Sequence, residues 1–266
     1  MWYYYLYIGL IINTINIPYD NGANKLGSKN APKVLNANLD FLDIDKEIYI
    51  NTNDFLTNII NSGYNSVLST LNENKFPLII GGDHTIAISS IFAINEYCNL
   101  NNKSLGILWC DAHADFNTMK TSMTKNIHGM PISVLCGHTL RTLQISEILL
   151  LPDQFAYYGV RDIDSLEFLR MQEYNMEILE NNNEIDRWIK KFDCIHISFD
   201  IDCLDPSVTN CVNTPVKNGK TTNELKKLFN KIKETNKLCG LDIVEYNPNN
   251  DSDHSIIIEI IKYLFL

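Results

Sequence analysis

The chain has 266 residues, of which 45% are hydrophobic and 20% are charged, and its formal net charge is −10. This length can bury a sizeable core, and alternating α/β folds of this length often form one domain, so we expect a single domain over residues 1–266. The acidic balance and the lack of a basic stripe argue against nucleic acid as a partner.

Short apolar runs alternate with longer amphipathic ones along the chain. The N-terminal stretch 1–12 is apolar, but it has no Lys or Arg and no small-residue cleavage pattern, so we expect a strand there rather than a signal peptide. No run reaches transmembrane length. The expected strands are 3–8, 78–80, 105–110, 155–160, 194–199 and 238–244, and the expected helices are 55–71, 86–97, 140–149, 165–172, 184–190, 223–233 and 255–264. This alternation predicts a three-layer α/β/α fold with a central, mostly parallel sheet.

Seven cysteines are spread along the chain, an odd number without Cys-x-x-Cys spacing. Several lie inside apolar runs, where a free cysteine behaves as a small hydrophobic residue. This pattern indicates a reducing compartment, and we expect a cytoplasmic protein.

Side chains of the kinds that bind metals follow three of the expected strands. In the extended segment Asp-Ala-His-Ala-Asp after 105–110, alternate side chains leave the backbone on the same side and can converge on one point. Ligands of parallel sheets bind at the carboxyl ends of the strands, where all these residues stand. The candidate metal ligands are His84, Asp111, His113, Asp115, Asp200 and Asp202.

Four carboxylates and two imidazoles favour a binuclear centre. The carboxylates cancel the charge of two divalent ions, and oxygen-rich ligation with some imidazole suits Mn²⁺, with Co²⁺, Ni²⁺ or Fe²⁺ as competitors. Two ions roughly 3.5–4 Å apart can hold one water and convert it to hydroxide near neutral pH. Each motif alone has a commoner explanation, since an Asp-x-Asp after a strand is usually a solvated loop or a helix cap. The joint placement of three motifs favours the metal centre.

The segments Gly81-Gly-Asp-His84, Asp111–Asp115 and 198–206 resemble the three signature motifs of the ureohydrolase family, which comprises arginases, agmatinases and formiminoglutamases. The resemblance covers residues 78 to 248. It implies an arginase-like fold, two Mn²⁺ per chain, no membrane partner, and a homo-oligomer, either trimer or hexamer. By motif position, one ion would be held by His84, Asp111, Asp115 and Asp200, and the other by His113, Asp111, Asp200 and Asp202.

The segment 115–129 resembles arginases most, by its Asn-Thr start, its length and its closing Asn-x-His-Gly. In arginases this loop grips the α-carboxylate of the substrate, and polar side chains and loop amides can supply the donors that a buried carboxylate needs. Asn117 matches directly, and Thr124 stands where arginases usually have Ser. Lys125 replaces a residue that is usually Gly. We expect it to be solvent-facing, with the alternative that it adds a positive charge near the carboxylate.

The resemblance places the α-amino group of the substrate against Asp164 and Glu167. Asp164-x-x-Glu167 also matches a helix capping box, which is the commoner explanation of this pattern on its own. Thr214, which precedes a proline, stands where the family has a threonine near the substrate; alone it would be an ordinary turn residue.

The remaining matches complete a mechanism. Glu245 corresponds to the glutamate that binds the guanidinium group, which a carboxylate can orient through two parallel hydrogen bonds. His128 would exchange protons with solvent, and Asp115 would pass a proton to the leaving amine. The expected reaction is attack of a metal-bridging hydroxide on L-arginine, which gives L-ornithine and urea.

Four other functions stay open. Agmatinase is the closest rival, and its substrate lacks the α-carboxylate that the loop 115–129 would grip; another guanidino acid is a related alternative. Formiminoglutamase fits less well because its corresponding loop lacks the Asn-Thr…His-Gly arrangement. A non-catalytic relative that serves in binding or regulation would be indicated by the loss of a metal ligand, and no ligand is lost.

Overall fold

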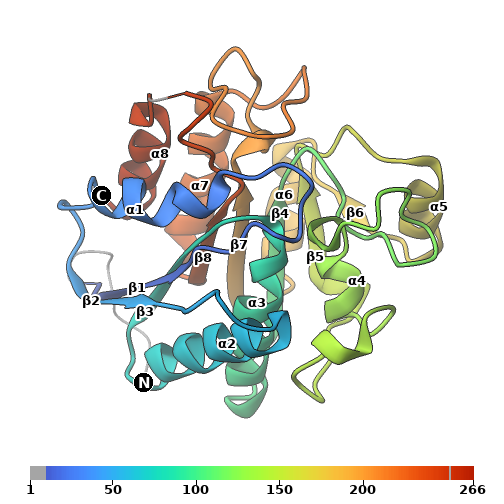
Figure 1. Cartoon of the computed structure of the whole chain (residues 1–266), viewed down its shortest axis with the longest axis horizontal. Coiled ribbons are helices and arrows are strands. Elements are labelled where there is room, and N and C mark those ends of the chain that lie inside the picture. Colours follow the sequence, from blue (N-terminus) through green and yellow to red (C-terminus); the bar gives the residue numbers. More distant parts are fainter. Residues whose placement is uncertain (1–9, 252) are drawn as a thin grey trace.

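The computed structural model describes residues 10–251 and 253–266, and its centre is an eight-stranded sheet in which all neighbouring strands are parallel (Figure 1). The strand order is β2-β1-β3-β8-β7-β4-β5-β6. The strands are β1 (Ile12–Ile17), β2 (Ile44–Tyr49), β3 (Phe76–Gly81), β4 (Leu105–Cys110), β5 (Phe155–Tyr158), β6 (Glu177–Ile178), β7 (Cys194–Asp200) and β8 (Leu238–Val244). The expected α/β fold with helices around a parallel sheet is confirmed.

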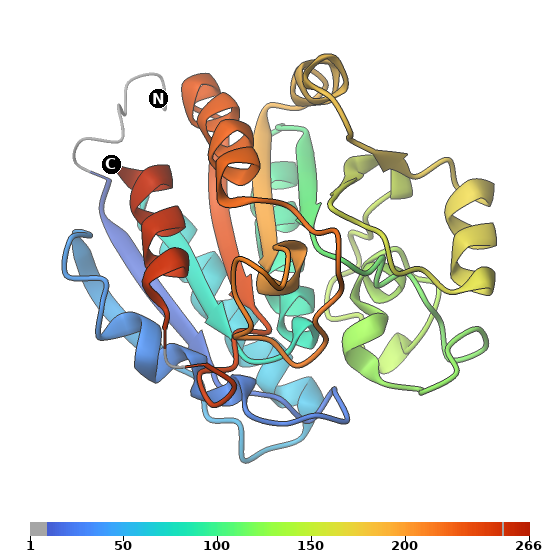
Figure 2. The same cartoon turned by 90° about the horizontal axis from the view of Figure 1, so that it is seen from above.

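The helices form two layers, one on each face of the sheet (Figures 1 and 2). The layer that shares one core cluster comprises α1 (Ala31–Asn36), α6 (Asn182–Ile189), α7 (Thr222–Thr235) and α8 (Ser255–Phe265). The layer on the other cluster comprises α2 (Leu56–Asn72), α3 (Ala87–Leu100), α4 (Pro131–Leu135) and α5 (Ser165–Glu173).

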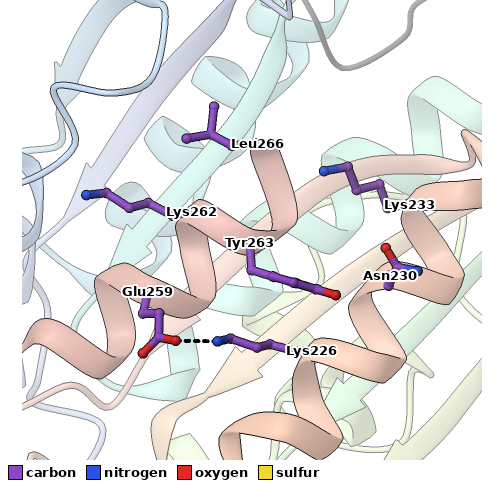
Figure 3. A pocket seen from close by; sticks show the side chains of 7 residues that line it. All are labelled: Lys226, Asn230, Lys233, Glu259, Lys262, Tyr263 and Leu266. Atoms are coloured by element: carbon purple, nitrogen blue, oxygen red, sulfur yellow. Dashed lines mark hydrogen bonds and ion pairs between the residues drawn. The ribbon is translucent and has the colours of Figure 1, made fainter.

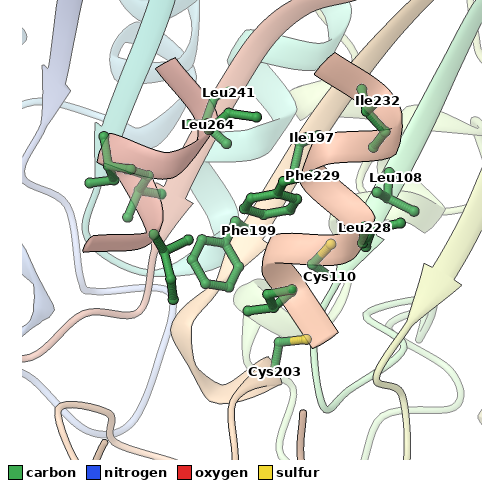
Figure 4. Close-up of a cluster of buried hydrophobic side chains, with 14 of the residues drawn as sticks. Leu108, Cys110, Ile197, Phe199, Cys203, Leu228, Phe229, Ile232, Leu241 and Leu264 are labelled. Carbon is green, nitrogen blue, oxygen red and sulfur yellow. The ribbon is translucent and has the colours of Figure 1, made fainter. Parts of the chain in front are cut away.

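The central strands are buried on both faces. Every residue of β3, β4 and β7 is buried, which explains why these strands appear in the sequence as continuous apolar runs. Under α7, Phe199 of β7 meets Phe229 edge-on, with ring centroids 5.8 Å apart (Figure 4). This packing holds the carboxyl ends of β7 and its neighbours in fixed positions, and these are the ends that carry the candidate site.

Strand β1 was not expected, because Asn13 and Asn16 interrupt its apolar pattern. Both side chains are buried and bonded to residues remote in sequence: Asn13 Nδ2 donates to Thr70 Oγ1 at 3.2 Å, and Asn36 Nδ2 donates to Asn16 Oδ1 at 2.7 Å. The sequence pattern also missed β2, β6, α1 and α4. The strand expected at 3–8 lies outside the described residues.

The helix expected at 140–149 is wrong. Only a 3-10 turn, Arg141–Leu143, forms there, and it follows Leu140 in the left-handed conformation, with φ of 45°. The rest of the segment is irregular. One of its backbone carbonyls is hydrogen-bonded to α3, since Asn95 Nδ2 donates to Ile148 O at 3.0 Å.

Within the described residues, no helix combines the length and the apolar character needed to cross a membrane. An open surface pocket of about 520 Å³ lies on α7 and α8 (Figure 3). Lys226 and Glu259 form an ion pair at its wall. Its other lining residues are Asn230, Lys233, Lys262, Tyr263 and Leu266, so it shares no residue with the candidate metal ligands.

Candidate metal centre and substrate site

The predicted metal ligands meet at the carboxyl ends of β3, β7 and β4, and Glu245 follows β8, which lies between β3 and β7. His84 begins the 3-10 turn after β3, and Asp202 lies in the 3-10 turn Ile201–Cys203 after β7. The side chains of Asp111, Asp200 and Asp202 are almost completely buried. Four adjacent strands therefore bring together residues that lie up to 161 positions apart.

His84 defines the first group of ligands. Its Nδ1 lies 2.9 Å from Asp111 Oδ2, 3.2 Å from Asp115 Oδ2 and 3.4 Å from Asp200 Oδ2. This nitrogen is buried and makes no hydrogen bond of acceptable geometry to any described residue. A buried nitrogen without a partner, faced by three carboxylate oxygens, is what a cation-binding site presents, and these residues fit a divalent ion.

The second group of ligands surrounds His113. Its Nδ1 lies 3.1 Å from Asp202 Oδ2 and 3.4 Å from Asp111 Oδ1. Asp111 thus faces His84 with one oxygen and His113 with the other, as a bridging carboxylate would. The cluster therefore contains two sets of ligand atoms that could each hold an ion. One set is His84 with Asp111 and Asp115, and the other is His113 with Asp111 and Asp202. That Asp200 also binds the second ion stays a prediction.

The electrostatics of the cluster favour bound cations. Burial, followed by the charges of neighbouring aspartates, raises the pKa of Asp200 well above its usual range and raises the pKa of Asp202 as well. Burial and the charge of Asp111 raise the pKa of Asp115 to about 6. Against the effect of burial, contacts with His113 and His84 lower the pKa of Asp111. Carboxylates at such close range repel one another, and divalent ions would remove this repulsion.

The orientation of His84 is set by a second layer of contacts. Its ring stacks on Trp109 with centroids 4.0 Å apart, and its Nε2 lies 2.9 Å from Ser198 Oγ. Ser198 Oγ donates to Asp242 Oδ2 at 3.3 Å, and His196 Nε2 lies 2.9 Å from the same oxygen. Partners of this kind fix the ring and direct the other nitrogen toward the metal.

Glu245 and His128 lie beside the first group of ligands. Glu245 Oε1 accepts from the backbone N–H of His84 at 3.1 Å and lies 3.0 Å from His128 Nδ1. Although burial lowers it, the pKa of His128 is raised to about 9 by the hydrogen bond with Glu245 and by nearby carboxylates. The imidazole keeps contact with solvent, with 22% of its side chain exposed, so it can exchange protons with water.

Asp164 and Glu167 face the segment that follows Asp115. Glu167 Oε1 accepts from Phe116 N at 2.8 Å, and Asp164 Oδ2 accepts from Asn117 Nδ2 at 3.0 Å. Asp164 is the N-cap residue of α5 by position, but its side chain makes no capping hydrogen bond, so the capping-box interpretation is wrong. Burial and the charge of Asp115 raise the pKa of Glu167 to about 8, so the ionised form of this carboxyl is costly beside the candidate metal centre.

The loop 115–129 keeps a glycine-like turn at Lys125. Its φ is 63°, in the left-handed region that glycine adopts most easily. The side chain is exposed, and its Nζ donates to Met119 O at 2.7 Å. Thr124 is also exposed, and Asn117 Oδ1 is buried without a partner among the described residues. The acceptor oxygen of Asn117 thus has no partner among the described residues, whereas a carboxylate could be met only by its Nδ2, which also donates to Asp164.

Thr214 and Arg161 support Asp202. Thr214 Oγ1 donates to Asp202 Oδ2 at 2.9 Å. Arg161 had no assigned role, yet its guanidinium donates to Asp202 O at 2.8 Å and to further carbonyls. The strongest of these further contacts are with Gly159 O, Val216 O and Lys217 O. Its position within Gly159-Val-Arg161-Asp162, directly after β5, was the one sequence signal that could have indicated this role.

Known proteins of one family resemble this chain along most of its length. The model of the arginase family matches residues 12–265. The chain belongs to the arginase family. An arginase of Staphylococcus aureus (strain COL) is 32% identical over 203 residues, which cover 71% of this chain and 66% of that protein, just under two thirds of the relative's length.

Solved structures share the fold over nearly the whole chain. The structure of Entamoeba histolytica arginase in complex with L-ornithine has a TM-score of 0.86 and 26% identity, and the match covers 96% of this chain and 97% of that one. A putative agmatinase of Clostridium difficile has a TM-score of 0.74 at 21% identity, covering 96% and 94% of the two chains. The fold is therefore common to family members named for different substrates, and the choice among substrates depends on side chains.

Proposed function

We propose that the protein hydrolyses the guanidinium group of L-arginine to give L-ornithine and urea. The observation that carries the proposal is the contact of Asp164 and Glu167 with the loop 115–129, directly beside the metal ligand Asp115. Two carboxylates at this position suit an α-amino cation, and Asn117 with the loop amides suits an α-carboxylate. The Entamoeba histolytica arginase was solved with L-ornithine, which is the amino acid product of the proposed reaction.

The residues present fit two Mn²⁺ ions. One would be held by His84, Asp111, Asp115 and Asp200; the other would be held by His113, Asp111, Asp200 and Asp202. When bound, such a pair supplies Lewis acidity and lowers the pKa of a coordinated water so that hydroxide is available near neutral pH. Mn²⁺ is proposed because the ligands are mostly carboxylate oxygens.

Three side chains of the protein orient the substrate and move its protons. Glu245, whose Oε1 is held by His84 N–H and His128, would pair with the guanidinium group and fix its plane. Asp115 would pass a proton to the leaving amine nitrogen, which becomes the side-chain amine of ornithine. His128 would exchange protons between the site and solvent, because its imidazole is partly exposed.

The test is urea release by Mn²⁺-loaded protein from L-arginine, agmatine and guanidinobutyrate. We expect the highest kcat/KM for L-arginine, because only L-arginine offers both the α-amino and the α-carboxylate group. A preference for agmatine would replace this proposal by the agmatinase function. No urea from any of the three, with metal content verified, would favour a non-catalytic binding or regulatory role.

A matched pair of variants locates the specificity. Asn117→Ala should raise KM for L-arginine while the KM for agmatine, which has no carboxylate, changes little. Asn126→Ala in the same loop tests in the same way whether the asparagine of the closing Asn-x-His-Gly also donates to the carboxylate. Three further expectations stay predictions: assembly as a trimer or hexamer, a single domain over residues 1–266, and a cytoplasmic location. Light scattering of the purified protein tests the oligomeric state.

A further inference from the structure

Three cysteines from three different elements meet at the end of the sheet opposite to the metal centre. Cys98 lies in α3, Cys194 is the first residue of β7, and Cys239 is the second residue of β8. Their sulfur atoms all lie within 4.8 Å of one another. Cys194 and Asp200 are the two ends of β7, so at about 3.3 Å per residue the thiols lie about 20 Å from the carboxylate-rich centre.

A β-bulge brings Cys239 into this group. Ile195 of β7 pairs with Leu238 and the next residue, His196, pairs with Gly240, so Cys239 is an extra residue without a partner. In a regular strand, 238 and 240 would share a face and 239 would point the other way. Here Cys239 packs in the cluster under α3, which is the same side on which a Cβ at Gly240 would meet Ile94 of α3. Bulges redirect side chains in this manner, and this one turns Cys239 toward Cys98 and Cys194.

The thiols combine burial with access from solvent. Cys98 and Cys194 are buried, and Cys239 is half-buried, with its Sγ 3.3 Å from Ile195 O. Hydrogen bonds from the Cys239 and Cys98 thiols, helped by the charge of Lys103, lower the pKa of Cys194 to about 4. A thiolate is the form of cysteine that binds metals, and a positive neighbour offsets its charge.

We propose that Cys98, Cys194 and Cys239 form a second metal site that binds one Zn²⁺ through three sulfur atoms. Tetrahedral zinc with Zn–S bonds of about 2.3 Å requires sulfur atoms about 3.8 Å apart, so a shift of about 1 Å from the present separations suffices. The fourth position would be taken by water on the half-exposed side of Cys239. Sulfur ligands select zinc and the carboxylate-rich centre selects manganese, so the two ends of the sheet would hold different ions.

An optical titration of the Mn²⁺-loaded full chain tests the site. Co²⁺ bound to thiolates gives sulfur-to-metal charge-transfer absorption, which the sulfur-free carboxylate centre does not produce. We expect a band that saturates at one Co²⁺ per chain and disappears on addition of Zn²⁺. Cys98→Ser and Cys239→Ser should each weaken Co²⁺ binding at least tenfold, while Cys136→Ser, at a cysteine outside the cluster, should leave the band unchanged. Absence of the band, or its survival in both cluster variants, overturns the proposal.

A second measurement needs no substitution and so does not depend on whether the variants fold. Zn²⁺ should slow the alkylation of Cys239 by iodoacetamide at least tenfold in the native protein, and a chelator should restore it, as read by peptide mass spectrometry. Unchanged labelling of Cys239 overturns the site. A count of five rather than seven titratable thiols in freshly unfolded protein would show a disulfide in place of the metal site and would likewise overturn it.

Discussion

Replacing Glu167 with glutamine should stabilise the metal-free protein at alkaline pH and weaken substrate binding. The Glu167 side chain is only 4% exposed, and burial followed by the charge of Asp115 raises its pKa to about 8. Glutamine keeps the oxygen that accepts from Phe116 N, so the hydrogen bond at 2.8 Å can persist. The substitution therefore removes the charge with little change in packing.

The magnitude follows from linkage. The ordinary pKa of 4.5 and the folded value of about 8 mean that the folded state holds one more proton than the unfolded state between these pH values. Stability therefore falls as pH rises through this window, by about 1.4 kcal/mol per pH unit for one group. The raised pKa of Glu167 therefore lowers the free energy of unfolding by under about 1 kcal/mol at pH 5. At pH 8 the loss reaches at most about 4–5 kcal/mol.

Urea denaturation in EDTA at about pH 5 and about pH 8 measures this difference. The free energy of unfolding of Glu167→Gln, relative to the unsubstituted protein, should grow by a few kcal/mol between the two pH values. Glu173→Gln, an exposed position on the same helix, should show no such growth. Parallel stability profiles for Glu167→Gln and the unsubstituted protein would refute the reasoning. In the Mn²⁺-loaded enzyme the same variant should raise KM for L-arginine more than it lowers kcat.

Three further predictions concern the loop, the support of Asp202 and the metal. Lys125→Gly should be more stable than Lys125→Ala by about 1 kcal/mol in urea denaturation, because φ is 63°; an unchanged KM for L-arginine in Lys125→Ala would reject a role of its charge. Arg161→Lys should weaken Mn²⁺ binding about tenfold by calorimetry, since lysine cannot reach all the carbonyls that Arg161 binds; equal affinity would contradict this. Chelation should lower the melting temperature more at about pH 8 than at about pH 5, because burial and neighbouring charges raise the pKa of Asp115, Asp200 and Asp202 in the metal-free protein; equal decreases would disprove it.

The part of the fold that carries the metal centre could be predicted from the sequence. Strands β3, β4 and β7 are buried throughout and β8 is buried from Gly240 on, and buried parallel strands leave continuous apolar runs that end where the polar motifs begin. Because strand ends of a parallel sheet meet at one edge, the runs and the motifs together predicted that the ligands converge. The spacing of Asp111, His113 and Asp115 contributed most, since it has few structural uses other than convergence on one point.

Other features depend on contacts that no local pattern encodes. Asn13 and Asn16 break the apolar run of β1, and their buried side chains bond to Thr70 and Asn36, which lie 57 and 20 residues away. The bulge at Cys239 is equally invisible, because simple alternation puts this residue on the opposite face from Gly240. The capping-box pattern of Asp164 was misleading for the same reason: the side chain has a partner in the loop after Asp115, and this competes with the helix terminus.

Two carboxylates of the candidate site are held in a backbone conformation that the chain would not choose by itself. Asp115 has φ of 48° and Glu245 has φ of 59°, and the left-handed region costs a residue with a side chain about 1–2 kcal/mol. The surrounding structure enforces it, since Asp115 O accepts from Ile132 N at 3.2 Å and Glu245 N donates to Gly82 O at 2.7 Å. Glycine would relieve the strain at either position but would remove the carboxylate. The buried core of β3, β8, β7 and β4 thus supplies the stability that allows strained, mutually repelling carboxylates to persist at its edge, which is where strain is expected when it serves a site.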